Sequence, residues 1–316
     1  MMSAKRSSNY ARRAGAILRT IGLAAGLAML GIGAIETADS QTIGNSMKPI
    51  PIPAQVPVKD GQAQIPDTKL WYWDTGGTGV PILLLHPATG SALIWGYQQP
   101  VFAKAGYRVI GYSRRGYHNS APFDRNNPGI GSEDLRHLAD ALGLGRFHVV
   151  ASAAGGSIAS DFAFSYQDRL LSLTVSSNSF GVRDGEIAKA AAFIRPKGWE
   201  QMPAEFRELG PSYRAANPAG VKAWIELEHK ALLGREYRQT LKNEITQARL
   251  KDLKLPTLVI SGAADMSTPP AISRMIAAEI PNSRLAPIPE AGHSSYWEQP
   301  EIFNRAVLDF IGGQSK

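Results

Sequence analysis

The sequence contains no cysteine among its 316 residues. This absence excludes disulfide bonds, thiolate metal ligands, a cysteine nucleophile and the acylated cysteine of a lipoprotein. A folded domain of this chain must therefore rest on its hydrophobic core alone. The hydrophobic composition of 44% is ordinary for a globular protein and is sufficient for such a core.

A dense run of one charge is also absent from most of the chain. The net charge is +7, but residues 1–40 supply five of the basic side chains: Lys5, Arg6, Arg12, Arg13 and Arg19. The other residues hold 29 basic and 25 acidic side chains. This near balance predicts no nucleic-acid partner.

The N-terminus has the order of regions that is typical of a signal peptide. Basic residues come first, residues 20–35 are uncharged and rich in Ala, Gly and Leu, and Ala38-Asp39-Ser40 is a plausible cleavage site. We therefore predict a signal peptide over residues 1–40, a periplasmic or secreted protein, and no stable membrane association after cleavage. The alternative is an uncleaved anchor, although the uncharged run is shorter than the roughly 20 residues that span a bilayer.

Residues 41–60 are polar and proline-rich, which predicts a surface linker. Short apolar runs then alternate with segments of helical spacing. The predicted strands are 69–74, 80–85, 108–112, 147–151, 171–176, 255–261 and 284–288. The predicted helices are 92–105, 132–142, 156–166, 270–279 and 300–311. This alternation predicts an α/β fold with a doubly wound, mostly parallel sheet.

The alternation stops at residues 181–250, which contain no convincing buried strand. We predict a helical cap there, between a first part of the core at 61–180 and a second part at 251–316. Such an insertion lies over the carboxyl edge of the sheet, where ligands bind in open α/β folds. Its aromatic residues, Trp199, Phe206, Tyr213 and Trp224, predict a pocket with apolar walls.

Five segments carry patterns that occur together: Leu83–Ala88, Tyr112–Ser120, Ala151–Gly155, Leu258–Pro269 and Pro289–Pro300. In this order they resemble the oxyanion turn, a marker loop, the nucleophile elbow, the acid loop and the histidine loop of the α/β-hydrolase superfamily. The resemblance covers residues 61–312. It implies a capped hydrolase fold of the esterase or lactonase kind.

The elbow departs from the superfamily pattern, which is Gly-x-Ser-x-Gly after a strand. The sharp turn needs small residues two positions before and after the nucleophile, and Ala151 and Gly155 flank Ala153 in this way. Alanine thus stands where the superfamily has its catalytic serine, by a natural or an introduced substitution. The alternative register, with Ser152 as nucleophile, would place Val150 in a crowded position.

The resemblance also implies roles for other residues. Asp265 takes the position of the catalytic acid and His293 that of the catalytic histidine. The backbone amides of Ala88 and Ala154 are the predicted oxyanion donors. The histidines are not spaced as a metal site, and no metal or cofactor is expected.

Three functions follow from this pattern. The first is an enzyme that cleaves an ester or lactone of a small, partly apolar substrate and lacks its serine. The second is serine-independent general-base catalysis by His293 and Asp265, of the lyase or cofactor-free oxygenase type. The third is a non-catalytic ligand-binding pseudoenzyme, which has no need of the retained histidine and aspartate.

Overall fold

The computed structural model describes residues 49–232 and 238–314. The predicted signal peptide and residues 41–48 of the predicted linker lie outside the described residues. Residues 49–58 form neither helix nor strand, and the first strand begins at Lys59, so it includes the last two residues of the predicted linker. No helix in the described part of the chain is long and apolar enough to span a membrane.

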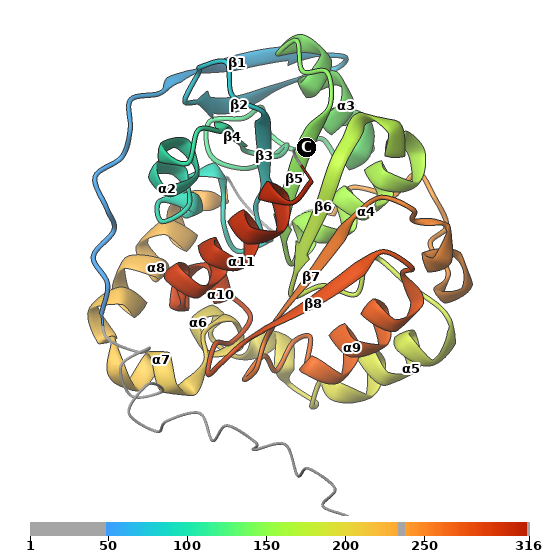
Figure 1. The fold of residues 1–316 in the computed structure, drawn as a ribbon. Coiled ribbons are helices and arrows are strands. Elements are labelled where there is room, and N and C mark those ends of the chain that lie inside the picture. The colour runs from blue at the N-terminus through green and yellow to red at the C-terminus, as the bar shows by residue number, and fades with distance from the viewer. Residues whose placement is uncertain (1–48, 233–237, 315–316) are drawn as a thin grey trace, which may run out of the picture. The chain divides into compact units, whose positions relative to one another are not determined.

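The described residues form one eight-stranded sheet with the order β1-β2-β4-β3-β5-β6-β7-β8 (Figure 1). The strands are β1 Lys59–Ile65, β2 Thr68–Asp74, β3 Pro81–Leu85, β4 Arg108–Tyr112, β5 Phe147–Ser152, β6 Leu170–Ser176, β7 Thr257–Gly262 and β8 Ser283–Ile288. Strands β3 to β8 pair in parallel. Strand β2 pairs antiparallel with β4 on one side and with β1 on the other. The predicted doubly wound, mostly parallel sheet is confirmed.

Helices cover both faces of this sheet because the buried strands alternate their side chains between two hydrophobic clusters. Leu83 and Leu85 of β3 pack with helices α3, α4 and α9, whereas Ile82 and Leu84 pack with α2 and α11. The bounds are α2 Gln99–Lys104, α3 Gly131–Ala141, α4 Ala154–Tyr166, α9 Pro270–Glu279 and α11 Pro300–Gly312. Shorter turns of helix are η1 Ala92–Trp95, η2 Gln167–Arg169 and α10 Ser295–Glu298.

A helical insertion separates β6 from β7, as the sequence predicts. It contains α5 Gly185–Ile194, η3 Trp199–Gln201, α6 Ala204–Glu208, α7 Pro211–Ala216, α8 Pro218–Ala231 and η4 Gln247–Asp252. Within its described residues, only the isolated bridges at Leu232 and Thr240 are extended pairings. We call residues 181–250 the cap from here on.

Candidate active site

The turn from β5 into α4 forms a sharp elbow at Ala153. Ala153 has φ 46° and ψ −121°, a conformation that residues other than glycine rarely adopt. Backbone hydrogen bonds fix it, because its N–H donates to Ser176 O at 3.0 Å and its carbonyl accepts from Gly156 N at 2.8 Å. The residue is almost buried and lines the main pocket. The elbow therefore presents a methyl group where the strand ends.

Small residues are a steric requirement of this elbow. A Cβ atom on Gly155 would lie 2.5 Å from the carbonyl oxygen of Leu85, which is part of the neighbouring strand. Ser152 lies one residue earlier, fully buried as the last residue of β5. Its Oγ has no hydrogen-bond partner among the described residues, and Ser152 is not part of the pocket lining. The structure thus places Ala153, and not Ser152, on the pocket.

Two backbone amides flank the elbow without an acceptor among the described residues, those of Ala88 and Ala154, and both residues line the pocket. The turn that carries Ala88 is held by His86 and Arg114. His86 Nε2 accepts from Arg114 N at 3.1 Å, and Arg114 Nη2 donates to Pro87 O at 3.0 Å. Burial, and then the charge of Arg114, lower the pKa of His86 well below its usual value, so this histidine is neutral.

Asp265 and His293 meet on the same side of the pocket. Nδ1 of His293 lies 2.9 Å from Oδ2 of Asp265, and both side chains are nearly buried. The carboxylate is itself oriented, because its Oδ1 accepts from the N–H groups of Ser267 and Thr268, both at 2.8 Å. Since Nδ1 faces the aspartate, Nε2 is the ring nitrogen left for the pocket that His293 lines.

The charge state of His293 follows from its neighbours. Burial lowers the pKa of His293, but the negative charges of Asp265 and Glu208 outweigh burial and raise the pKa to about 9. This raised pKa favours the imidazolium form of the ring at neutral pH. The imidazolium must lose a proton before the ring can act as a base.

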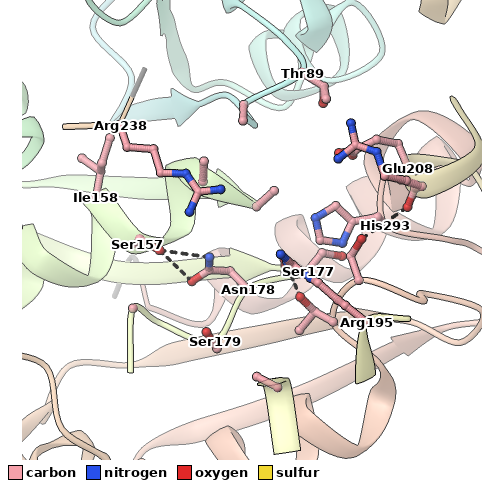
Figure 2. Close-up of a pocket in the computed structure, with 18 of the residues that line it drawn as sticks. Thr89, Ser157, Ile158, Ser177, Asn178, Ser179, Arg195, Glu208, Arg238 and His293 are labelled. Carbon is pink, nitrogen blue, oxygen red and sulfur yellow. Dashed lines mark hydrogen bonds between the residues drawn. The ribbon is translucent and has the colours of Figure 1, made fainter. Parts of the chain in front are cut away.

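Glu208, at the end of α6, is a residue that the sequence analysis missed. It lines the pocket beside His293, as Figure 2 shows, and its Oε2 accepts from Ser294 Oγ at 3.2 Å. Burial raises the pKa of this carboxyl group. No sequence pattern could indicate it, because one glutamate among the charged residues of the cap has no motif around it.

Glu298 is the second missed residue, and it holds the histidine loop against the cap. Its carboxylate accepts from Gly292 N at 2.9 Å and from Gly210 N of the cap at 2.8 Å. A Cβ on Gly292 would lie 2.4 Å from Gly210 N, and one on Gly262 would lie 2.0 Å from Gly292 O. Three glycines thus allow β7, the histidine loop and the cap to touch, and Glu298 joins two of these segments.

The pocket has a volume of about 720 Å³ and lies between the sheet edge and the cap. Its lining includes eight charged residues, which are Arg114, Arg183, Arg195, Arg207, Arg238, Glu200, Glu208 and Glu228. The predicted apolar walls are only part of this lining, in which Ile158, Val182 and Ile272 lie among the charged residues. Tyr213 and Trp224 pack into the core cluster beneath α8 instead, and of the four cap aromatics only Trp199 lines the pocket.

This arrangement can move protons and stabilise negative charge. The histidine–aspartate pair accepts and returns a proton, and two amides beside the elbow can donate to an oxyanion. Alanine at the elbow has no atom that can attack a substrate or be acylated. In the described residues, no group of three or more His, Asp or Glu side chains could hold a metal ion.

Comparison with known proteins places the chain in a family. Residues 82–306 match the alpha/beta hydrolase family, and the chain belongs to it. A proposed carbamate hydrolase of Caulobacter sp. (strain K31) is 30% identical over 255 residues, which cover 74% of this chain and 91% of that protein. The 2-hydroxy-6-oxononadienedioate/2-hydroxy-6-oxononatrienedioate hydrolase of Burkholderia vietnamiensis is 28% identical over 287 residues, covering 80% and 93%.

Solved structures show the same relationship. A thermophilic esterase from Thermogutta terrifontis, with malate bound, superposes with a TM-score of 0.66 and 26% identity over 82% of this chain and 100% of that one. The enol-lactonase from Burkholderia xenovorans LB400 shares the fold, with a TM-score of 0.63 and 22% identity over 80% and 100% of the two chains. The curated relatives of this chain thus include proteins named as hydrolases of more than one kind.

Proposed function

We propose that the pocket is the site of an acyl hydrolase for an ester or lactone of a small, partly apolar substrate, with Ala153 in place of its serine. The observation that carries this proposal is the elbow itself. Ala153 holds a strained conformation beside the free amides of Ala88 and Ala154, and the His293–Asp265 pair faces the same pocket. The relationship to esterases supports it.

In a serine-bearing form, each group has a definite task. The hydroxyl at position 153 attacks the carbonyl carbon, and Nε2 of His293 takes its proton. Asp265 keeps the proton of Nδ1 in place and stabilises the imidazolium, while the two amides donate to the oxyanion. His293 then returns the proton to the leaving alcohol.

With alanine at the elbow, hydrolysis by this chain takes one step fewer. His293 Nε2 accepts a proton from water, and the water oxygen bonds to the carbonyl carbon. The bond to the leaving oxygen breaks as that oxygen receives the proton from His293, and no acyl-enzyme forms. Loss of a triad member leaves catalysis on the order of 10³–10⁴ over water.

The test compares the native chain with Ala153→Ser on short 4-nitrophenyl esters and on lactones. We expect a gain in kcat/KM on the order of 10³-fold, because the other catalytic groups are in place. Ala153→Ser with Ser152→Ala is the matched control and should keep this gain. The proposal fails if Ala153→Ser folds and turns over no ester or lactone.

A second candidate is serine-independent general-base chemistry, of the lyase or cofactor-free oxygenase type. It is favoured by the completeness of the His293–Asp265 pair and by the second carboxyl group, Glu208, on the same wall. It predicts activity in the native chain that Ala153→Ser leaves unchanged and His293→Ala abolishes. Tight ligand binding without turnover by either protein would instead indicate a binding protein.

Export to the periplasm or the medium is also a proposal, which rests on the order of charged, apolar and small residues at 1–40. Expression of the full chain in a Gram-negative host, followed by N-terminal sequencing of the periplasmic and secreted fractions, tests it. We expect a mature N-terminus near residue 40. A protein that keeps residues 1–40 in the cytoplasm would contradict the proposal.

A further inference from the structure

The cap wall of the pocket holds two arginines that share one carboxylate. Arg195 Nη1 lies 3.4 Å from Oε1 of Glu200, and Arg207 Nη1 lies 3.5 Å from Oε2 of the same residue. All three residues line the pocket. Two guanidinium groups against one carboxylate leave a net positive charge at this wall.

The shared ion pair is weak. Both contacts are long, and the exposed fractions of the side chains are 47% for Arg195, 59% for Glu200 and 23% for Arg207. Exposed ion pairs of this kind contribute little to stability, so an incoming anion can replace Glu200. The charge also reaches the reactive end of the pocket, because Arg195 lowers the pKa of His293.

The rest of the lining adds positive charge. Arg183 is exposed and makes no ion pair with the described residues, and Figure 2 shows Arg238 across the pocket from His293. Arg114 is different, because its guanidinium donates to Pro87 O and stacks over Tyr117. Arg114 therefore stabilises the turn at Pro87, and its guanidinium is not available to bind a ligand.

Acidic groups in the lining do not cancel this charge. Apart from Glu200, they are Glu208 and Glu228, and burial raises the pKa of both carboxyl groups. Even with all three glutamates ionised, the four arginines of the lining other than Arg114 leave an excess of positive charge.

We propose that the substrate carries a carboxylate in addition to its cleavable carbonyl, and that Arg195 and Arg207 bind this carboxylate while the carbonyl lies at Ala153. The inference rests on the proposed function for the position of the carbonyl, but not for the anion site. A carboxylate fits best because the planar guanidinium group presents paired N–H donors that match its two oxygens. The substrate class is a short half-ester or a lactone acid.

The first test measures binding to the native chain by calorimetry and needs no turnover. Monomethyl glutarate is the anionic probe, and dimethyl glutarate is its neutral isostere. We expect the half-ester to bind at least about tenfold more tightly, as a charge-assisted hydrogen bond of about 1.5–3 kcal/mol implies. Its affinity should fall as salt is raised, whereas that of the diester should not.

Variants assign the effect to the cap wall. Arg195→Gln and Arg207→Gln should each weaken binding of monomethyl glutarate about tenfold, and Glu200→Gln should tighten it because a competing carboxylate is lost. A gain of affinity cannot come from damaged folding. Lys189→Gln removes one positive charge from α5 outside the pocket lining, and it should leave the affinity unchanged.

Two outcomes overturn the inference. One is equal affinity for monomethyl and dimethyl glutarate in the native chain, and the other is indifference to Arg195→Gln, Arg207→Gln and Glu200→Gln. Methyl phosphate is a further probe and should bind more weakly than the half-ester; tighter binding would contradict a carboxylate as the ligand group.

Turnover separates this inference from the proposed function. If Ala153→Ser hydrolyses 4-nitrophenyl valerate as well as 4-nitrophenyl hydrogen glutarate, the hydrolase proposal stands and the carboxylate site is wrong. If the arginine-dependent binding appears but no variant hydrolyses either ester, the anion site stands and the hydrolase proposal is wrong.

Discussion

The elbow at Ala153 can be compared with the two loops that carry Asp265 and His293. The elbow has a sharply turned backbone, with φ 46° at Ala153, and the N–H of Ala154 donates to no described residue. It has no reactive side chain. The two loops have an ordered backbone and reactive side chains, because the imidazole of His293 and the carboxylate of Asp265 lie 2.9 Å apart in a nearly buried position. The elbow thus offers a backbone turn and a free amide, whereas the two loops also offer reactive side chains.

This difference shows that the shape of the elbow does not depend on a hydroxyl group. It depends on Gly155, which lets α4 approach Leu85, and on the backbone hydrogen bonds of Ala153. Alanine is thus sufficient at this position for the turn to form. Four predictions test how far the two regions are independent, beginning with the largest effect.

Removal of the imidazole should have the largest effect. In an Ala153→Ser background, His293→Ala should lower kcat/KM for a short 4-nitrophenyl ester on the order of 10⁴-fold or more, because the new hydroxyl loses its base. His137→Ala, on α3 outside the pocket lining, is the control and should leave the rate unchanged. A loss below about tenfold would show that the two regions do not work together.

Glu298→Gln should change how stability depends on pH. Burial raises the pKa of Glu298 to about 8, against about 4.5 when unfolded. Between pH 4.5 and 8 the unfolded chain therefore releases a proton that the folded chain retains, so stability falls as pH rises, by up to about 5 kcal/mol. Glutamine still accepts from Gly292 and Gly210 but does not titrate.

Urea denaturation at several pH values provides the measurement. The native chain should lose stability across this window, and Glu298→Gln should lose clearly less. The raised pKa of His293 gives both proteins a further decline from about pH 6.5 to 9. Parallel curves for the two proteins between pH 4.5 and 6.5 would contradict the assignment to Glu298.

Gly155→Ala should destabilise the fold by about 2–3 kcal/mol, because the new Cβ meets the backbone oxygens of Leu85 and His86 at 2.5 and 2.8 Å. Gly145→Ala is the matched control, since nothing lies within 4 Å of a Cβ there. Chemical denaturation of both variants is the measurement. Equal stabilities would show that the elbow does not need a small residue at position 155.

Ala153→Gly should have the smallest effect, a gain of about 1 kcal/mol in the free energy of unfolding. Glycine relieves the strain of a positive φ, and this relief exceeds the entropy that glycine loses on folding. Ala151→Gly, inside β5, should instead destabilise. Thermal unfolding distinguishes the two, and a loss of stability in Ala153→Gly would mean that the elbow is not strained.

Much of the fold could be predicted from the sequence, because buried parallel strands are continuous apolar runs. Arg108–Tyr112 has the predicted bounds of β4, and Pro270–Glu279 those of α9. Strand β1, Lys59–Ile65, was not predicted, because most of its residues are polar and only Ala63 and Ile65 are buried. An edge strand with one covered face gives a weak apolar signal.

Local motifs indicated the residues of the catalytic loops, whereas the other residues of the site are placed by tertiary contacts. Asp265 and His293 lie in loops with recognisable neighbours, and the structure brings them into hydrogen-bond contact. Glu208 and Glu298 could not be predicted, since burial of a glutamate depends on which segments pack over it. The prediction from the cap aromatics failed for the same reason. Tyr213 and Trp224 pack into the core, and arginines line the pocket.

The bond from Glu298 to Gly210 has a consequence for the contact between the cap and the histidine loop. Any motion of the cap that separates Gly210 from Gly292 brings water to a carboxyl group that the closed protein keeps protonated up to about pH 8. In water that group would ionise near its ordinary pKa, so a separation of Gly210 from Gly292 at neutral pH would release a proton. Acid would therefore strengthen this contact between the cap and the histidine loop, and alkali would weaken it.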